Sequence, residues 1–329
     1  MLRSIGIAIP LLLAGPANAP GTAGAIGGHA AFQMPDIKPP AVDEASCSVE
    51  PAIRLTASTP AVSGVCVEDG RILVNGKDAT DFAMTDVLTR RFGPVMRGEN
   101  VPGLHVERVA ARDARADDVL GLGLVNASNG IGDATFRDLV WIGDPDAPAI
   151  NSNDAWAAIA LKGKDGNDFG TFTIENFDFQ NLAMAPGPNY RNVDGISTEA
   201  GYSGTIRNGR VLNATDACLD IKGDVHVDNV QLSGCREGMK IWSSQHHGLV
   251  ELGTSGFVGI IGKGGAKGPR TIRIDVLIAS GDPDVPLFRA EGGVVNLEIG
   301  TLIANSGQVM EAGGSFPGST VTVGERLQF

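Results

Sequence analysis

The residues best suited to chemistry lie in three short segments in the middle of the chain. These segments are 192–198 (NVDGIST), 215–223 (TDACLDIKG) and 235–242 (CREGMKIW). Together they hold carboxylates, lysines, an arginine and a tryptophan. Paired carboxyls perform glycoside hydrolysis, and a basic side chain can remove a proton beside a carboxylate in a β-elimination. The three segments therefore point to chemistry on a carbohydrate.

The spacing of the three segments predicts the element that positions them. When Ile196, Leu219 and Met239 are treated as equivalent, the intervals are 23 and 20 residues, which matches one turn of a β-solenoid. A single turn cannot bury its apolar side chains, but turns stacked about 4.8 Å apart bury them in a column and pair their backbone groups. We therefore expect an all-β, single-stranded parallel β-helix with about 21–25 residues per turn.

The flanking sequence keeps the same period. Short runs of alternating apolar residues, bounded by Gly, Asn, Asp or Pro, are typical of strands. They surround Phe136, Phe172, Ile206, Val227, Val250, Ile272, Val295 and Val321. One segment has helical spacing instead, since Phe82, Met84, Val87 and Leu88 could share one face of a short helix over 81–91. We expect that helix to cap the N-terminal end of the solenoid.

Alternation also predicts which side chains of the three segments face solvent. With Ile196, Leu219 and Met239 inside, together with Thr198, Ile221 and Ile241, the intervening residues point outward. The expected outward positions are Ser197, Asp220 and Lys240, then Glu199, Lys222 and Trp242, and on the other side Asp194, Ala217 and Glu237.

Three kinds of carbohydrate chemistry suit this outward face. Hydrolysis would use two of Asp194, Asp216 and Asp220. β-Elimination would use Lys222, Arg236 or Lys240 as the base, with Ca²⁺ held by carboxylates to neutralise the substrate. Carbohydrate binding alone would use Trp242 as a stacking platform with a polar neighbour such as Glu237. The expected calcium ligands are Asp194, Glu199, Asp216 and Asp220.

Two alternatives stay open for these residues. Asp220 with Lys240, and Asp216 with Arg236, can be cross-strand ion pairs that only order a solvated face. His246 and His247 follow the third segment and can contact substrate or act as acid or base, because imidazole titrates near neutrality. A pair of histidines in a surface turn is the other interpretation of these two residues.

The first residues predict export. Arg3 precedes an apolar run from Ile5 to Ala14, and Ala17-Asn18-Ala19 follows, as in a secretory signal peptide over 1–19 with cleavage as late as residue 30. An uncleaved anchor is the alternative. Residues 20–60 are rich in Gly, Ala and Pro and predict a linker, with the β-helix over 61–329. We expect a secreted or periplasmic protein.

Four cysteines in an exported chain suggest up to two disulfides. The simplest pairing is Cys47 with Cys66 and Cys218 with Cys235, although Cys218 can equally be a buried thiol in the core.

The net charge of −12 over 329 residues argues against nucleic acid or an anionic membrane as a partner. The mixed charges between residues 191 and 240 can still bind a charged glycan locally. We expect a polysaccharide partner, no membrane span in the mature chain, and a monomer or a trimer of the tailspike kind.

Two of the three segments resemble the polygalacturonase family within the pectate-lyase-like superfamily. NVDGI at 192–196 is similar to the family's Asn-Thr-Asp-Gly strand, and TDACLDIK at 215–222 is similar to its Gly-Asp-Asp-Cys strand one turn later. The resemblance implies a right-handed parallel β-helix in which Asp216 donates a proton and Asp194 positions water. The sequence departs from the family at Ala217, which replaces an Asp, and at 236–238 (REG), where the family has Gly-His-Gly.

These observations lead to one expectation and one alternative from another class. We expect an exported enzyme that cleaves a polysaccharide, one containing uronic acid, by β-elimination or hydrolysis, with no cofactor or with Ca²⁺ for a lyase. The alternative is a non-catalytic β-solenoid for glycan binding, adhesion or surface structure.

Overall fold

The computed structural model describes residues 31–49, 52–75, 80–91, 95–114, 123–148, 156–163, 167–253 and 256–329. The predicted signal peptide and its cleavage sites lie outside these residues. The described chain is built of β-strands with one short 3₁₀ helix, η1 (Glu44–Ser46). No helix in the described part is long and apolar enough to cross a membrane.

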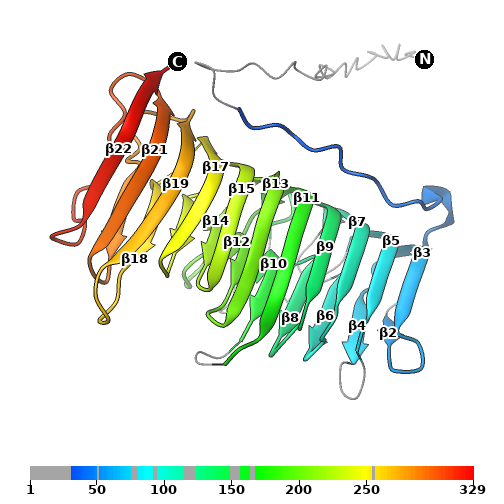
Figure 1. Ribbon diagram of the computed structural model, residues 1–329. Helices are drawn as coiled ribbons and strands as arrows, with labels where there is room; N and C mark the ends of the chain where they lie inside the picture. The colour runs from blue at the N-terminus through cyan, green and yellow to red at the C-terminus, as the bar shows by residue number, and fades with distance from the viewer. Residues whose placement is uncertain are drawn as a thin grey trace, which may run out of the picture.

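The strands form two parallel sheets (Figure 1). The first has twelve strands in this order: β1 (Ser48–Val49), β3 (Ala61–Glu68), β5 (Ala83–Arg90), β7 (His105–Ala114), β9 (Ala134–Gly143), β11 (Gly170–Leu182), β13 (Tyr202–Ala214), β15 (Asp224–Ser233), β17 (Gln245–Gly253), β19 (Arg270–Ala279), β21 (Val295–Ala304) and β22 (Thr320–Gln328). The second has ten: β2 (Ile53–Leu55), β4 (Ile72–Asn75), β6 (Met96–Glu99), β8 (Val125–Ser128), β10 (Trp156–Lys162), β12 (Val193–Thr198), β14 (Ala217–Ile221), β16 (Glu237–Ile241), β18 (Val258–Lys263) and β20 (Phe288–Glu291).

Successive strands alternate between the two sheets, so each turn of chain adds one strand to each. This arrangement is a right-handed parallel β-helix, as predicted. The predicted register is confirmed, because Ile196 pairs with Leu219 and Leu219 with Met239. The eight apolar residues used to follow the period each lie in a different strand of the twelve-stranded sheet, from β9 to β22.

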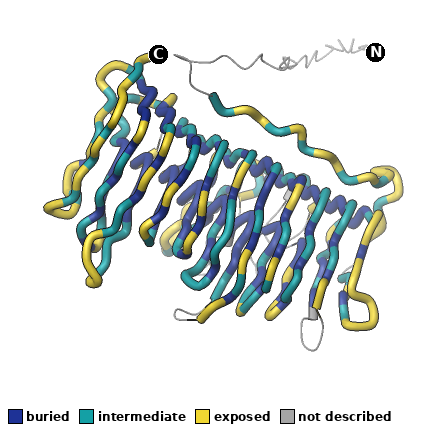
Figure 2. The backbone as a smooth tube through the Cα atoms, viewed as in Figure 1, coloured by how far each residue is buried: buried dark blue, intermediate teal, exposed yellow. Residues whose placement is uncertain are grey.

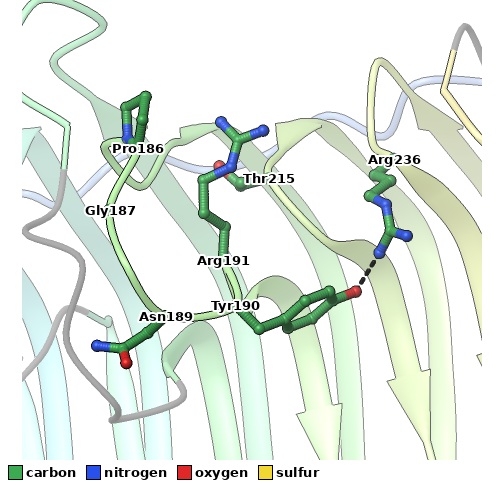
Figure 3. Close-up of a pocket in the computed structure, with 7 residues that line it drawn as sticks. All are labelled: Pro186, Gly187, Asn189, Tyr190, Arg191, Thr215 and Arg236. Atoms are coloured by element: carbon green, nitrogen blue, oxygen red, sulfur yellow. Dashed lines mark hydrogen bonds between the residues drawn. The ribbon is translucent and has the colours of Figure 1, made fainter.

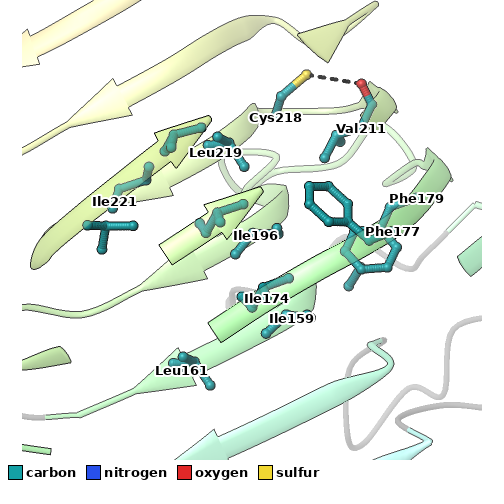
Figure 4. Packing of buried hydrophobic residues seen from close by; sticks show 14 of the residues in the cluster. Ile159, Leu161, Ile174, Phe177, Phe179, Ile196, Val211, Cys218, Leu219 and Ile221 are labelled. Carbon is teal, nitrogen blue, oxygen red and sulfur yellow. Dashed lines mark hydrogen bonds between the residues drawn. The ribbon is translucent and has the colours of Figure 1, made fainter. Parts of the chain in front are cut away.

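One continuous apolar core fills the space between the sheets. Figure 4 shows Ile159, Ile196 and Leu219 from successive rungs in a column, beside Phe177 and Phe179 of the facing sheet. All five side chains are fully buried. Figure 2 shows buried residues on the strands of both sheets; they alternate with more exposed ones on strands such as β15 and β17, whereas every residue of β14 and β16 is buried. Burial of these columns supplies the main stabilisation of the fold.

A corner divides the longer strands of the twelve-stranded sheet into two halves. Equivalent residues of seven successive rungs have φ between 49° and 68°: Gly64, Asp86, Arg108, Asp138, Asn176, Asn208 and Asn229. Gly, Asn and Asp tolerate this left-handed conformation better than other residues. We call this row the corner ladder. It interrupts the inside–outside alternation once in each strand.

The corner explains why the helix predicted over 81–91 is wrong. The segment forms strand β5. Phe82, Met84 and Val87 point into the core. Leu88 points to the outside, where it forms a small apolar cluster with Cys66 and Ala110. Because Asp86 occupies the corner, the inward positions shift by one residue, and their spacing imitates a helical period. In the described residues no helix caps the first rung; β1 pairs with the end of β3.

The predicted linker over 20–60 also needs correction in its described part. β2 already belongs to the ten-stranded sheet, where it pairs with β4. We call residues 31–47 the strap: residues 31–43 run along the outside of the twelve-stranded sheet, across its strands, and η1 and Cys47 follow (Figure 1). The strap contacts the corner ladder at three places: Gln33 at Asn229, Lys38 at Asp138, and Ala41 at Asp86.

Disulfides join both cysteine pairs expected from the sequence. Cys47 at the end of the strap is bonded to Cys66 of β3. Cys218 of β14 is bonded to Cys235, just before β16, so the alternative of a free buried thiol is wrong. Both sulfur atoms of the second pair lie in the core.

Candidate functional site

The predicted site residues gather on the outer face of the ten-stranded sheet, the side turned away from the core. On β12, β14 and β16 the register aligns Ser197 with Asp220 and Lys240, and Ala217 with Glu237. Neighbouring rungs lie about 4.8 Å apart. Side chains from residues that are 20 to 26 positions apart in sequence therefore meet, and we call Asp194, Asp216, Asp220 and Glu237 the carboxylate cluster.

Asp216 is the centre of the cluster and is fully buried. Its Oδ2 accepts a hydrogen bond from Nζ of Lys240 at 2.8 Å. Its Oδ1 accepts one from Nη1 of Arg236 at 3.2 Å and another from the Tyr190 hydroxyl. Arg236 also donates to the oxygen of Tyr190. Three donors, two from the β16 rung and one from the loop before β12, thus converge on a single carboxylate.

Lys240 and Arg236 each bridge two carboxylates. Nζ of Lys240 lies 3.2 Å from Oε2 of Glu237, and Nη1 of Arg236 lies 3.3 Å from Oε1 of the same residue. Although burial by itself lowers the pKa of Lys240, the charges of Asp216, Asp220 and Glu237 raise it above its usual value. Lys240 is therefore held as a cation and is unsuited to act as a base.

The other three acids of the cluster have raised pKa values. Burial is the main cause at Asp194, followed by the charges of Asp220 and Asp216. Burial also raises the pKa of Asp220 and of Glu237, against the opposing effect of Lys240. Oε2 of Glu237 is buried, and despite its nearness to Lys240 no hydrogen bond of acceptable geometry reaches it. A buried carboxyl of this kind favours its protonated form.

Trp242 lies in the next outward row, between lysines of the two neighbouring rungs. Its ring centroid is 5.3 Å from Nζ of Lys222 and 5.2 Å from Nζ of Lys263. Its indole Nε1 donates to Oδ1 of Asp220 at 2.6 Å. The lysines in turn pair with Glu199 and Glu291. Because cations from both sides lie over the ring, Trp242 is not the open stacking platform that we expected.

A shallow pocket of about 360 Å³ lies beside the cluster (Figure 3). Tyr190 and Arg236 form one wall, and the rest comes from the loop before β12 and from Thr215. The pocket is lined by Pro186, Gly187, Asn189, Tyr190, Arg191, Thr215 and Arg236. The Tyr190 side chain, 57% exposed, separates the pocket from fully buried Asp216. A ligand in the pocket would therefore reach the cluster past Tyr190.

The residues do not fit the expected calcium site. In the described chain no group of three or more His, Cys, Asp and Glu side chains is arranged to hold a metal ion. Lys240 lies against Asp216, and Glu199 is bonded to Lys222 at 2.6 Å. Ammonium groups thus already neutralise these carboxylates.

The ion pairs expected from the sequence are formed in part. Asp216 pairs with Arg236 as predicted, but Lys240 bonds to Asp216 rather than to Asp220, whose partner is Trp242.

The two histidines lie away from the site. His246 and His247 belong to β17 of the twelve-stranded sheet and not to a turn. His246 is exposed and bonded to Asp275 at 2.8 Å. His247 is fully buried, and its Nδ1 accepts from the backbone N–H of Val227. Neither is bonded to a residue of the carboxylate cluster, because both lie on the twelve-stranded sheet.

Several residues of the site could not be identified from the sequence alone. Tyr190 and Arg191 come from a loop with no repeat pattern. The other residues come from later turns, after the segments 192–198, 215–223 and 235–242. They are Phe257 in the turn before β18, Lys263 in β18, and Arg289 and Glu291 in β20. In the next turn, Ile261 is the residue equivalent to Lys240, and Lys263 is equivalent to Trp242. Extending the period by one turn would therefore have predicted the position of Lys263.

Comparison of the chain with protein-family models, with curated proteins and with solved structures gave no match. The fold and the geometry of the site therefore carry the functional argument.

Proposed function

We propose that the protein is an exported, carbohydrate-active enzyme that hydrolyses a glycosidic bond of a polysaccharide on the outer face of the ten-stranded sheet. The observation that carries the proposal is the pair formed by Asp216 and Glu237. One carboxylate accepts three hydrogen bonds, and its neighbour has a raised pKa and an unpaired buried oxygen. Two carboxyls in different environments are what glycoside hydrolysis needs.

The roles follow from these environments. Glu237, whose pKa is raised by burial, donates a proton to the leaving glycosidic oxygen. Asp216, which accepts hydrogen bonds from Lys240, Arg236 and Tyr190, stabilises the positive charge that develops on the sugar or attacks it. Asp216 and Glu237 come from adjacent rungs, about 4.8 Å apart. Both side chains lie within 3.3 Å of Nζ of Lys240 and of Nη1 of Arg236, so one glycosidic bond can be reached by both carboxyls.

β-Elimination is the weaker of the two reactions on this site. Its base must give up a proton near neutral pH. The carboxylates raise the pKa of Lys240, and Tyr190 and Glu237 raise that of Arg236 against the effect of burial. Lys222 is bonded to Glu199. The calcium that would neutralise a uronate in such a reaction has no fitting ligand set among the described residues.

A second candidate function is glycan binding without cleavage, on a secreted or surface protein. Asp216 is fully buried and Glu237 is 3% exposed, so a substrate reaches them only after Tyr190 moves aside. If Tyr190 stays in place, the ion pairs around Asp216 order the outer face of the ten-stranded sheet, and no substrate reaches the two carboxyls.

The test is incubation of the mature chain with carboxylated, sulfated and neutral polysaccharides. New reducing ends and the ultraviolet absorbance of an unsaturated product are followed together. Reducing ends without absorbance, lost in Asp216→Asn with folding intact, support hydrolysis. A rise in absorbance would establish elimination instead. Silence with every polymer would leave the binding function.

A further inference from the structure

The outer face beyond the carboxylate cluster carries an alternating row of guanidinium groups and aromatic rings. Cζ of Arg236 lies 5.3 Å from the ring centroid of Tyr190 and 5.4 Å from that of Phe257. On the other side of Phe257, Cζ of Arg289 lies at 5.1 Å. The row thus runs across the strands, from the loop before β12 to β20.

A second row beside it has the same composition in shorter form. Lys222, Trp242 and Lys263 alternate in the same direction, with both ammonium groups within 5.3 Å of the ring centroid. In each row an aromatic ring holds a cation from either neighbouring rung. Cation–π contacts of this kind fix the position of a charge without neutralising it.

The cations of the two rows are partly exposed, whereas the carboxylates of Asp216 and Glu237 are buried. The side chains of Arg236, Arg289, Lys222 and Lys263 are 41%, 28%, 24% and 22% exposed. Asp216 and Glu237 beneath them are 0% and 4% exposed. Glu199 and Glu291 are the acids of these rows that reach the surface. Arg289 also pairs with Glu291, so four partly exposed cations share this surface with two partly exposed carboxylates, in a chain of net charge −12.

We propose that the two rows are a binding track for an acidic polysaccharide, one that bears carboxylate or sulfate groups and lies along the solenoid axis over rungs β14 to β20. The planar guanidinium binds either anion through two parallel N–H groups. The cations of each row belong to rungs two steps apart, about 9–10 Å, so the track contacts acidic groups at intervals along the polymer. The position of the cleaved bond along the track rests on the proposed function. The binding of an acidic polymer to the track does not depend on cleavage.

The experiment measures binding of three size-matched oligosaccharides by titration calorimetry at low and high salt. The probes are oligogalacturonate for carboxylate, dextran sulfate for sulfate and unmodified dextran as the neutral control. Arg289→Gln and Phe257→Ala alter the track without touching Asp216 or Glu237. Arg273→Gln is the matched control, since Arg273 is an exposed arginine of β19 paired with Glu298 on the other sheet.

We expect a salt-sensitive affinity for one or both acidic probes, weakened about ten-fold by Arg289→Gln and less by Phe257→Ala, with no change in Arg273→Gln. The probe that binds more tightly identifies the acidic group. The proposal is overturned when no acidic probe binds, when dextran binds as well as they do, or when Arg289→Gln leaves their affinity unchanged. Binding of an acidic probe without its cleavage would reject the proposed hydrolysis and keep the track. Cleavage of an acidic polymer at limiting concentration that Arg289→Gln leaves unchanged would reject the track and keep the hydrolysis.

Discussion

At the scale of single residues, the buried Oε2 of Glu237 is the most informative atom of the site, because it lies 3.2 Å from Nζ of Lys240 but accepts no aligned hydrogen bond. Nearly all buried polar atoms in proteins have a hydrogen-bond partner, and an exception calls for a physical reason. In the proposed reaction the missing partner of Oε2 is the glycosidic oxygen of the substrate. The cost of leaving this oxygen unpaired in the free protein is then recovered when substrate binds.

Glu237→Gln tests this role. The amide keeps the shape but cannot donate a catalytic proton, so we expect turnover to fall by about 10²–10⁴ while the folded state is retained. Reducing-end assays and circular dichroism provide the two measurements. Glu251→Gln is the matched control, because Glu251 is bonded to Gln231 on the other sheet and its change leaves the site intact. Equal activity in both variants would remove Glu237 from the mechanism.

The pH dependence of turnover gives a second test at this scale. The pKa of Glu237 is raised in the folded protein, so the proton donor stays protonated to a higher pH than an ordinary Glu. We expect activity to fall as the pH rises through that raised pKa. Lys240 opposes the shift, and Lys240→Met should therefore move the alkaline limb of the profile to still higher pH. If the alkaline limb of the Lys240→Met profile stays in place or moves to lower pH, Glu237 is not the proton donor.

At the scale of elements, strand β17 contains an acid-sensitive residue. His247 is fully buried, and burial together with His226 and His246 lowers its pKa to about 3. An unfolded chain has an ordinary histidine pKa of about 6.5. Because the folded value is the lower one, the stability from this residue is complete above about pH 6.5 and is lost as the pH falls toward 3.

We predict that the free energy of unfolding decreases by a few kcal/mol between pH 7 and pH 4 on account of His247. In His247→Leu most of that decrease should disappear, although the variant loses the acceptor for the Val227 N–H and starts from a lower stability. Urea unfolding at both pH values measures the effect. His246→Leu is the comparison variant: it removes a smaller cause of the lowered pKa of His247 and keeps its burial, so most of the acid sensitivity should remain.

The elements also show what the sequence could and could not predict. The period of the three central segments fixed the register of β12, β14 and β16, because equivalent inward residues recur in a stack. Strand β5 was mistaken for a helix because one left-handed residue, Asp86, shifts the alternation that identifies a strand. The outward residues of the site were predicted, and so was the pair of Asp216 with Arg236, but Tyr190 was not, because loop residues follow no period.

At the scale of the whole molecule, the two disulfides act at different places. Cys218–Cys235 closes a loop between adjacent rungs inside the core, and Cys47–Cys66 fastens the strap to the third strand. The strap is further held by Glu44, which pairs with Arg90 and Arg112, and by Val42 against the outer apolar cluster.

We predict different outcomes for the loss of each disulfide. Cys218→Ala with Cys235→Ala should lower the stability of the whole chain by about 3 kcal/mol, seen in urea unfolding. Cys47→Ser with Cys66→Ser should leave the site and turnover unchanged but make the strap susceptible to limited proteolysis. Cleavage within 31–47 at the rate of the intact protein would show that the other contacts suffice to hold the strap.

The strap has a mechanical consequence for the solenoid. Each rung contacts only its neighbours, so a force along the axis loads every interface in series and opens the weakest one. Gln33 and Ala41 bind rungs five steps apart, about 24 Å, and eight residues of chain span at most about 26–29 Å. The strap is therefore almost taut. It acts in parallel with the five interfaces beneath it and limits how far any of them can separate, whereas the rungs after β15 have no such tie among the described contacts.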